Sequence, residues 1–137
     1  MGVGLEFIGA LPPNPGMPTD LVPEELIRTL RALAQDSATQ RALFPAFVAV
    51  PDELVEDFGA ALDQSWPGFL TRNPDIAALD DLIRARSGLP EFWTDDALDR
   101  SPFWADLRNR ARQILQDRGL PLTPPLPAPH KTYISGP

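Results

Sequence analysis

Residues 101–119, SPFWADLRNRARQILQDRG, decide the fold because they combine signals for the start and end of a helix with a large apolar surface. Ser101 can cap the first free N–H groups, Pro102 suits the first helical position, and Gly119 suits the left-handed residue that often ends a helix. At about 100° per residue, the large apolar side chains share an arc of about 120°. They are Phe103, Trp104, Leu107, Ala111, Ile114 and Leu115. We therefore predict a central helix with this face buried.

The same stretch carries three arginines that border or oppose the apolar face: Arg108, Arg110 and Arg112. Long arginine stems can cover the edge of an apolar surface while the charged head stays in water. We expect these guanidinium groups to remain solvated or to pair with carboxylates.

Three other stretches combine helical periodicity with start signals. One begins near Pro23, one spans residues 52–64, and one begins with Asn73 as its cap and Pro74 as its first residue. Their inward apolar side chains are Leu26, Ile27, Leu30, Leu33 and Ala34 in the first, Leu54, Val55, Phe58, Ala61 and Leu62 in the second, and Ile76, Leu79, Leu82 and Ile83 in the third. Together with the central helix they predict a mainly α fold, a compact bundle of four to five helices.

Shorter features lie between these helices. Ser37 and Gln40 have the spacing of a capping box, which predicts a short helix beginning there. Gly59 borders the apolar side of the second stretch and suggests a close approach of another helix. Residues 94–100, TDDALDR, suggest a short acidic turn that leads into the central helix.

Both ends of the chain are expected to be extended. Residues 1–22 contain a short run of β-forming residues and then several prolines. Residues 120–137 are proline-rich and form either a strap docked on the body, which we favour, or a mobile tail. The β-forming residues near the two ends could pair as a small sheet of terminal strands. Leu126 and Tyr133 are expected to pack on the helical body, as apolar anchors of the strap. All of these parts are assigned to one domain, residues 1–137.

Composition excludes several classes of protein. The chain has 137 residues, enough for one core, and it has no cysteine, which removes disulfides and thiolate chemistry. Its net charge of −7 argues against nucleic-acid binding, since affinity for phosphates comes largely from lysine and arginine. The sequence has no apolar run of about 20 residues and no secretion signal. We expect a cytoplasmic protein with no membrane contact and no cofactor.

The charge is distributed unevenly. Residues 51–99 hold twelve acids and three bases, whereas residues 100–137 hold two acids and six bases. One interpretation is that the acidic helices pair with the arginine-bearing last helix inside the domain. The other is that an acidic surface is kept for a cationic partner. The sequence leaves both open.

Candidate site residues come from this acidic region. Asp52 with Glu56, and Glu53 with Asp57, lie at i, i+4 spacing and so share helix faces. Such a face could hold a hard cation or simply be solvated; no glycine loop or EF-hand pattern accompanies it, and we expect no metal site. The second group surrounds the acidic turn, where a tryptophan could serve as an interface anchor. The predicted partner-binding residues are Glu91, Trp93, Asp95, Asp96, Asp99, Glu53, Glu56 and Asp57.

No catalytic constellation is visible. His130 is the only histidine and lies in the proline-rich end, without a second metal ligand or a nucleophile in a suitable context. We therefore expect no enzyme. The sequence favours a small acidic binding protein that neutralises a basic partner, as a bacterial immunity protein or antitoxin neutralises a toxin or effector. The alternative is a structural or assembly subunit of a larger bacterial or phage complex. The oligomeric state is not determined by these patterns.

Overall fold

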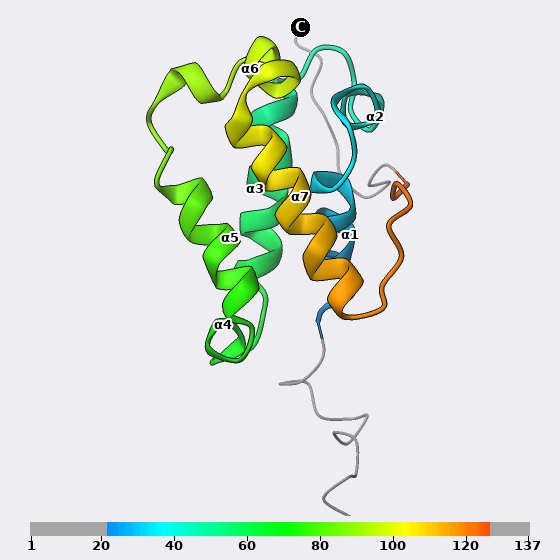
Figure 1. The fold of residues 1–137 in the computed structure, drawn as a ribbon, viewed down its shortest axis with the longest axis vertical. Helices are drawn as coiled ribbons and strands as arrows, with labels where there is room; N and C mark the ends of the chain where they lie inside the picture. The colour runs from blue at the N-terminus through cyan, green and yellow to red at the C-terminus, as the bar shows by residue number, and fades with distance from the viewer. Residues whose placement is uncertain (1–21, 127–137) are drawn as a thin grey trace, which may run out of the picture.

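The computed structural model describes residues 22–126, and helices account for 67% of this range, without any strand in it. Four long helices pack together: α1 (Glu24–Leu33), α3 (Val50–Asp63), α5 (Pro74–Arg84) and α7 (Pro102–Asp117). Shorter helices connect them: α2 (Ser37–Ala42), α4 (Phe69–Arg72), the 3₁₀ turn η2 (Pro90–Phe92) and α6 (Asp95–Arg100). The predicted mainly α fold is confirmed (Figure 1). The suggested pairing of terminal strands concerns residues outside the described range.

The central helix α7 forms as its sequence predicts. The Ser101 hydroxyl accepts a hydrogen bond from the Phe103 N–H at 3.2 Å, Pro102 opens the helix, and Gly119 follows its end with φ of +66°. All six predicted apolar residues are buried. In Figure 1, α7 crosses the front of the molecule, and it packs on α1, α5 and α6.

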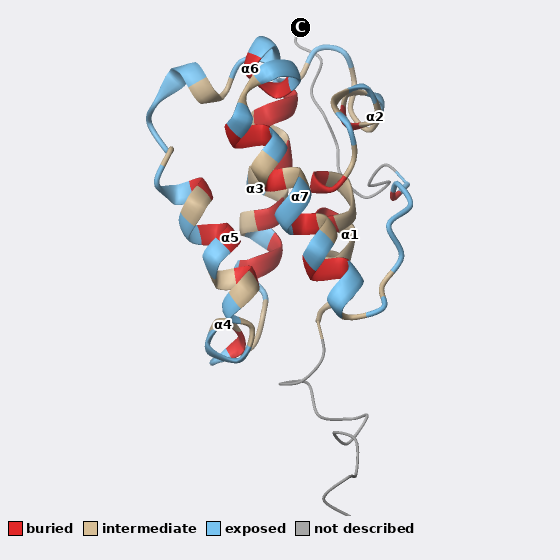
Figure 2. Ribbon diagram, in the orientation of Figure 1, coloured by how far each residue is buried: buried red, intermediate tan, exposed pale blue. Residues whose placement is uncertain are grey.

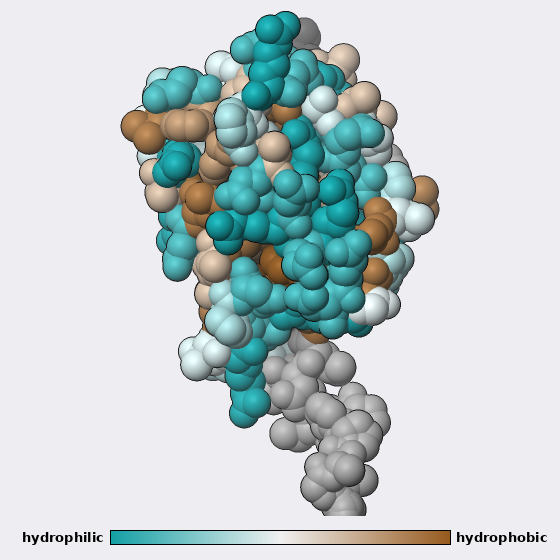
Figure 3. All heavy atoms as spheres, viewed as in Figure 1, coloured by the Kyte–Doolittle hydropathy of each residue, from teal (hydrophilic) through white to brown (hydrophobic). Residues whose placement is uncertain are grey.

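The core lies between α1, α3, α5 and α7, whose buried surfaces face one another (Figure 2). Trp104 is its largest fully buried side chain, and its Nε1 donates to the main-chain oxygen of Phe92 at 2.7 Å. Edge-to-face contacts join Trp104 to Phe103 and Trp93. The face of α7 turned toward the viewer is covered with hydrophilic side chains (Figure 3).

Three expectations about local features are wrong. The cap of α2 is Asp36, which accepts from the Thr39 N–H at 2.8 Å, so Ser37 and Gln40 form no capping box. The expected acidic turn is the helix α6, because the Thr94 hydroxyl caps it and Asp95 and Asp96 occupy its first turn, where the helix dipole favours acids. Gly59 marks no close helix approach, since a Cβ there would meet no atom within 4 Å.

After α7 the chain runs beside α1 as an extended segment without helix or strand, residues 120–126; from here on, the strap means this described part of the proline-rich segment (Figure 1). The expectation that Leu126 packs on the body is wrong, because this residue is 82% exposed. Pro125 is the buried residue of the strap. Arg31 of α1, and Gln35 just after α1, donate to main-chain oxygens of the strap. Tyr133 and His130 lie outside the described residues.

Candidate functional site

A groove of about 360 Å³ lies between α3 and the connection from α5 to η2. From α3 it receives Asp52, Val55 and Glu56, which share one helix face through their i, i+3 and i+4 spacing. The remaining lining residues are Ile83, Ser87, Gly88 and Trp93. We call this feature the acidic groove, because its two charged side chains are both carboxylates.

The orientation of Trp93 in this groove is fixed from within the protein. Its Nε1 donates to the main-chain oxygen of Arg86 at 3.0 Å. Its ring meets Phe103 and Trp104 edge to face, with centroids 5.6 and 5.9 Å apart. Because the indole N–H is used internally, Trp93 offers the groove an apolar and π-electron surface. The residue is half-buried.

This lining suits a long cationic side chain. The aliphatic stem of lysine or arginine packs well on Val55, Ile83 and an aromatic ring, while the charged head requires an acceptor. Aromatic faces attract such cations, and carboxylates bind them by charge-assisted hydrogen bonds. The groove provides both kinds of surface within one small volume.

The structure divides the predicted site residues between different environments. Glu56 and Trp93 meet in the acidic groove, together with Asp52, which the sequence paired with Glu56. Glu53 and Asp57 also lie on α3 and are half-buried, but they do not line the groove. Glu91 is exposed in η2.

The acids of α6 serve contacts within the fold. Arg41 of α2 donates to the Asp99 carboxylate at 2.7 Å and to the main-chain oxygen of Asp95 at 3.1 Å. Hydrogen bonds from Arg41 and Ser37 lower the pKa of Asp99 to about 2. Asp96 pairs with Arg100 one turn away at 3.2 Å, with both side chains exposed. Asp99 therefore links α6 to α2.

A second internal ion pair connects the end of α7 to the start of α5. Arg118 donates to both carboxylate oxygens of Asp75, at 2.8 and 2.9 Å, and to the side-chain oxygen of Asn73 at 2.9 Å. This hydrogen bonding holds the pKa of Asp75 below its usual range. Pairing of acidic helices with late arginines therefore occurs here, as one interpretation of the charge distribution expects.

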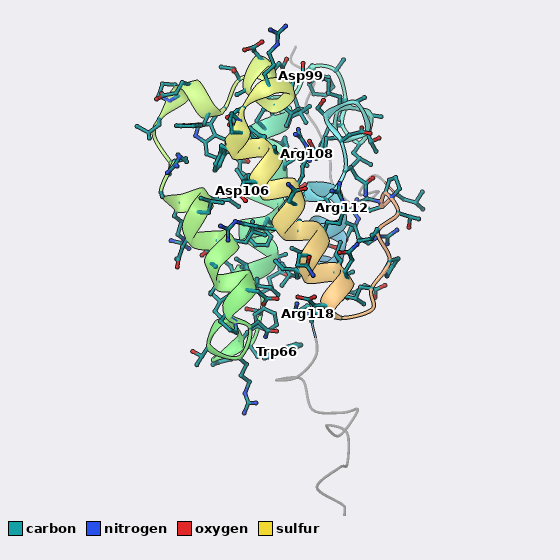
Figure 4. The ribbon with its side chains drawn as sticks, viewed as in Figure 1. Trp66, Asp99, Asp106, Arg108, Arg112 and Arg118 are labelled. Carbon is teal, nitrogen blue, oxygen red and sulfur yellow. The ribbon has the colours of Figure 1, made fainter. Side chains whose placement is uncertain are left out.

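Arg108 and Arg112 behave differently from the sequence expectation, because they bind main-chain oxygens (Figure 4). Arg112 donates to the oxygen of Ala34 at 2.7 Å, just after α1. Arg108 donates to the oxygen of Leu98 and to the side-chain oxygen of Gln40. Burial has the largest effect on the pKa of Arg108 and lowers it.

Gln40 completes this arrangement and was missed as a structural residue. It is fully buried, and its Nε2 donates to the oxygens of Ala32 and Leu33 at 3.2 and 3.1 Å. The last carbonyl groups of a helix have no partner within the helix, so Gln40 and Arg112 satisfy them here. The available sequence signal is that α1 ends without the glycine that would normally help satisfy these groups.

Within residues 22–126, no three or more potential metal-ligating side chains gather in a way that could hold an ion. No helix in the same range has the length and apolar character needed to cross a membrane. No protein-family model, curated protein or solved structure matches the chain, so the site is interpreted from its own geometry.

Proposed function

We propose that the protein is a small binding protein that engages a basic protein partner, and that the acidic groove receives a lysine or arginine side chain of that partner. A bacterial toxin or effector neutralised in the manner of an immunity protein or antitoxin is the partner class we favour. The supporting observation is the convergence of Asp52 and Glu56 with the oriented ring of Trp93 in one groove. The net charge of −7 would accelerate association with a basic partner.

The two groove carboxylates differ in their relation to the helix dipole. Asp52 occupies the first turn of α3, where an acid interacts favourably with the helix dipole. Glu56 lies a full turn further along the helix, beyond the reach of that effect. The acids of α6 are less suited to a partner, because Arg41 already binds Asp99 and the backbone of Asp95.

The test compares two double variants with the same charge change. Asp52→Asn with Glu56→Gln removes both groove carboxylates, and Asp63→Asn with Asp81→Asn removes two exposed carboxylates that do not line the groove. Full-length wild type and both variants are used for affinity capture from the native host, and association with the captured protein is then measured at several salt concentrations.

We expect capture of a basic protein, with association weakened about tenfold or more by the groove variant, corresponding to about 1.4 kcal/mol, and little changed by the control. The salt dependence should also decrease in the groove variant. Equal association by both variants would contradict the proposal. A salt-insensitive partner bound equally by all three proteins would favour the assembly-subunit interpretation.

A further inference from the structure

Three polar side chains, Arg28 and Arg31 on α1 and Gln35 just after its end, bind the strap; we call them the α1 ladder. Gln35 Nε2 donates to the oxygen of Leu122 at 2.7 Å, and Arg28 Nη2 donates to the oxygen of Leu126 at 2.6 Å. Between them, Arg31 donates to the oxygens of Thr123 and Pro124 at 2.8 and 3.2 Å. Every residue of the ladder therefore binds strap backbone.

The two partners have matching lengths and run in opposite directions. Residue numbers rise along the strap as they fall along the ladder, from Gln35 opposite Leu122 to Arg28 opposite Leu126. Within α1, the three-residue step from Arg28 to Arg31 spans about 4.5 Å at helical rise, and the two-residue step between their acceptors, Leu126 and Pro124, spans about 6 Å at the rise of an extended polyproline-like chain. The ladder is therefore spaced to bind an extended peptide.

The contacts between the ladder and the strap involve mainly the strap's backbone and two of its side chains. Prolines have no N–H donor, and an extended proline-rich chain leaves its carbonyl groups free to accept. Apart from those carbonyls, Arg31 binds the Thr123 hydroxyl at 2.9 Å, and the ring of Pro125 is buried. Leu122 and Leu126 are exposed. The recognised feature is thus an extended Thr-x-Pro segment.

The strap lies along α1 but does not fill the space next to it. A groove of about 650 Å³ remains between them, with Val22 and Ile27 on the α1 side and Pro121 and Pro124 on the strap side. The ladder's hydrogen bonds to the strap are themselves at the exposed surface. The net contribution of such exposed bonds is small, because water can take the place of either partner.

We propose that the α1 ladder is a binding site for an extended proline-rich peptide of a partner protein, and that the strap is its intramolecular competitor. The occupant seen in the structure defines the ligand chemistry: accepting carbonyls in a Thr-x-Pro segment. A tethered segment competes at an effective concentration near the millimolar range, so the strap limits binding of weaker peptides. This site involves none of the residues of the acidic groove and does not depend on the function proposed for it.

The test uses the full-length protein and a fluorescein-labelled peptide with the sequence of residues 120–126, LPLTPPL. Binding is measured by fluorescence anisotropy. A strap variant, Thr123→Ala with Pro125→Ala, removes the bound hydroxyl and the buried ring but leaves the ladder intact. If the strap occupies the site in about nine molecules of ten, its release should lower the peptide's Kd about tenfold.

Two further changes identify the ladder as the site. Arg31→Ala or Gln35→Ala, each added to the strap variant, should weaken peptide binding about threefold to fivefold. Arg110→Ala is the matched control, because Arg110 is an exposed arginine on α7 whose partner is Asp106, and it should leave binding unchanged. Circular dichroism checks that each variant keeps its helix content.

The proposal fails if the strap variant does not bind the peptide better than wild type, or if both ladder changes leave binding unaltered. It also fails if light scattering shows a dimer that the peptide does not dissociate, because the strap of a second copy would then be the occupant. A glycine-substituted peptide, GGGTGGG, should bind more weakly, since it lacks the buried proline ring and the preformed extended conformation.

Discussion

Two sets of side chains, each with two arginines and one glutamine, bind main-chain oxygens, and they differ mainly in their access to water. The inner set consists of Gln40, Arg108 and Arg112. Gln40 and Arg112 donate to main-chain oxygens at the end of α1, and Arg108 donates to the oxygen of Leu98 in α6. The outer set is the α1 ladder, which holds the strap. The donors and acceptors are chemically the same in both.

Burial gives the two sets different roles. Gln40 has no exposed surface. If its side chain is removed, water cannot replace it as the hydrogen-bond donor to the main-chain oxygens that it binds. The hydrogen bonds of the ladder lie at the surface, where water can replace a lost donor at little cost. The same kind of hydrogen bond, from a side chain to a main-chain oxygen, is therefore a permanent contact in the interior and an exchangeable contact at the surface.

The largest predicted effect concerns Trp104, the largest fully buried side chain of the core. Trp104→Ala should lower the free energy of unfolding by about 3–5 kcal/mol, through lost burial and the cavity left behind. Urea denaturation followed by circular dichroism measures it. If the midpoints of wild type and variant coincide, α7 is not the centre of the core.

The second prediction compares the two glutamines directly. Gln40→Ala should cost about 2–3 kcal/mol, because it leaves the buried oxygen of Leu33 without its donor and removes an acceptor from Arg108. Gln35→Ala should cost less than about 1 kcal/mol, because water reaches the oxygen of Leu122. Urea denaturation of both variants provides the comparison, and equal costs would remove the distinction between the inner and outer sets.

The third prediction concerns stability in acid. Neither set contains a carboxylate, but Asp99 lies beside the inner set. The pKa of Asp99 in the folded protein, about 2, lies below its ordinary value of 3.8. Its contribution to stability is therefore present above about pH 4 and is lost as the pH falls through 2. Asp99→Asn should flatten the decline in stability between pH 4 and 2.

The partner variant Arg41→Gln should give a similar flattening, since either change removes the same ion pair. Denaturation midpoints at a series of pH values measure both effects. An unchanged acid profile in both variants would show that the link between α2 and α6 contributes no acid-sensitive stability.

The smallest predicted effect on stability concerns the outer set. Arg31→Ala should lower the free energy of unfolding by less than about 1 kcal/mol, because its hydrogen bonds to the strap are exposed. Backbone amide relaxation should nevertheless show increased ps–ns motion at Leu122 and Thr123, with α1 unchanged. Arg112→Ala is the inner counterpart, and a smaller loss of stability there than in Arg31→Ala would reverse the comparison.

The sequence could predict the features that depend on residues close together in the chain. The start of α7 at Ser101 and Pro102, its buried face, and the start of α5 at Pro74 all agree with the structure. The acidic turn was misassigned although Thr94 and its following acids form a local helix start, so that signal was present and overlooked. Of the candidate site, the sequence identified Glu56 and Trp93 but had no means of bringing them together.

The sequence by itself determined the helical class, the positions of the long helices and the face that each buries, because caps and apolar periodicity act over a few residues. Only the tertiary structure decided where the polar side chains bind. Arg108 and Gln40 are 68 positions apart, and Arg28 and Leu126 are 98 apart. Such pairs follow from how the packed helices place their surfaces, and a donor's sequence neighbours carry no information about which distant carbonyl will lie within its reach.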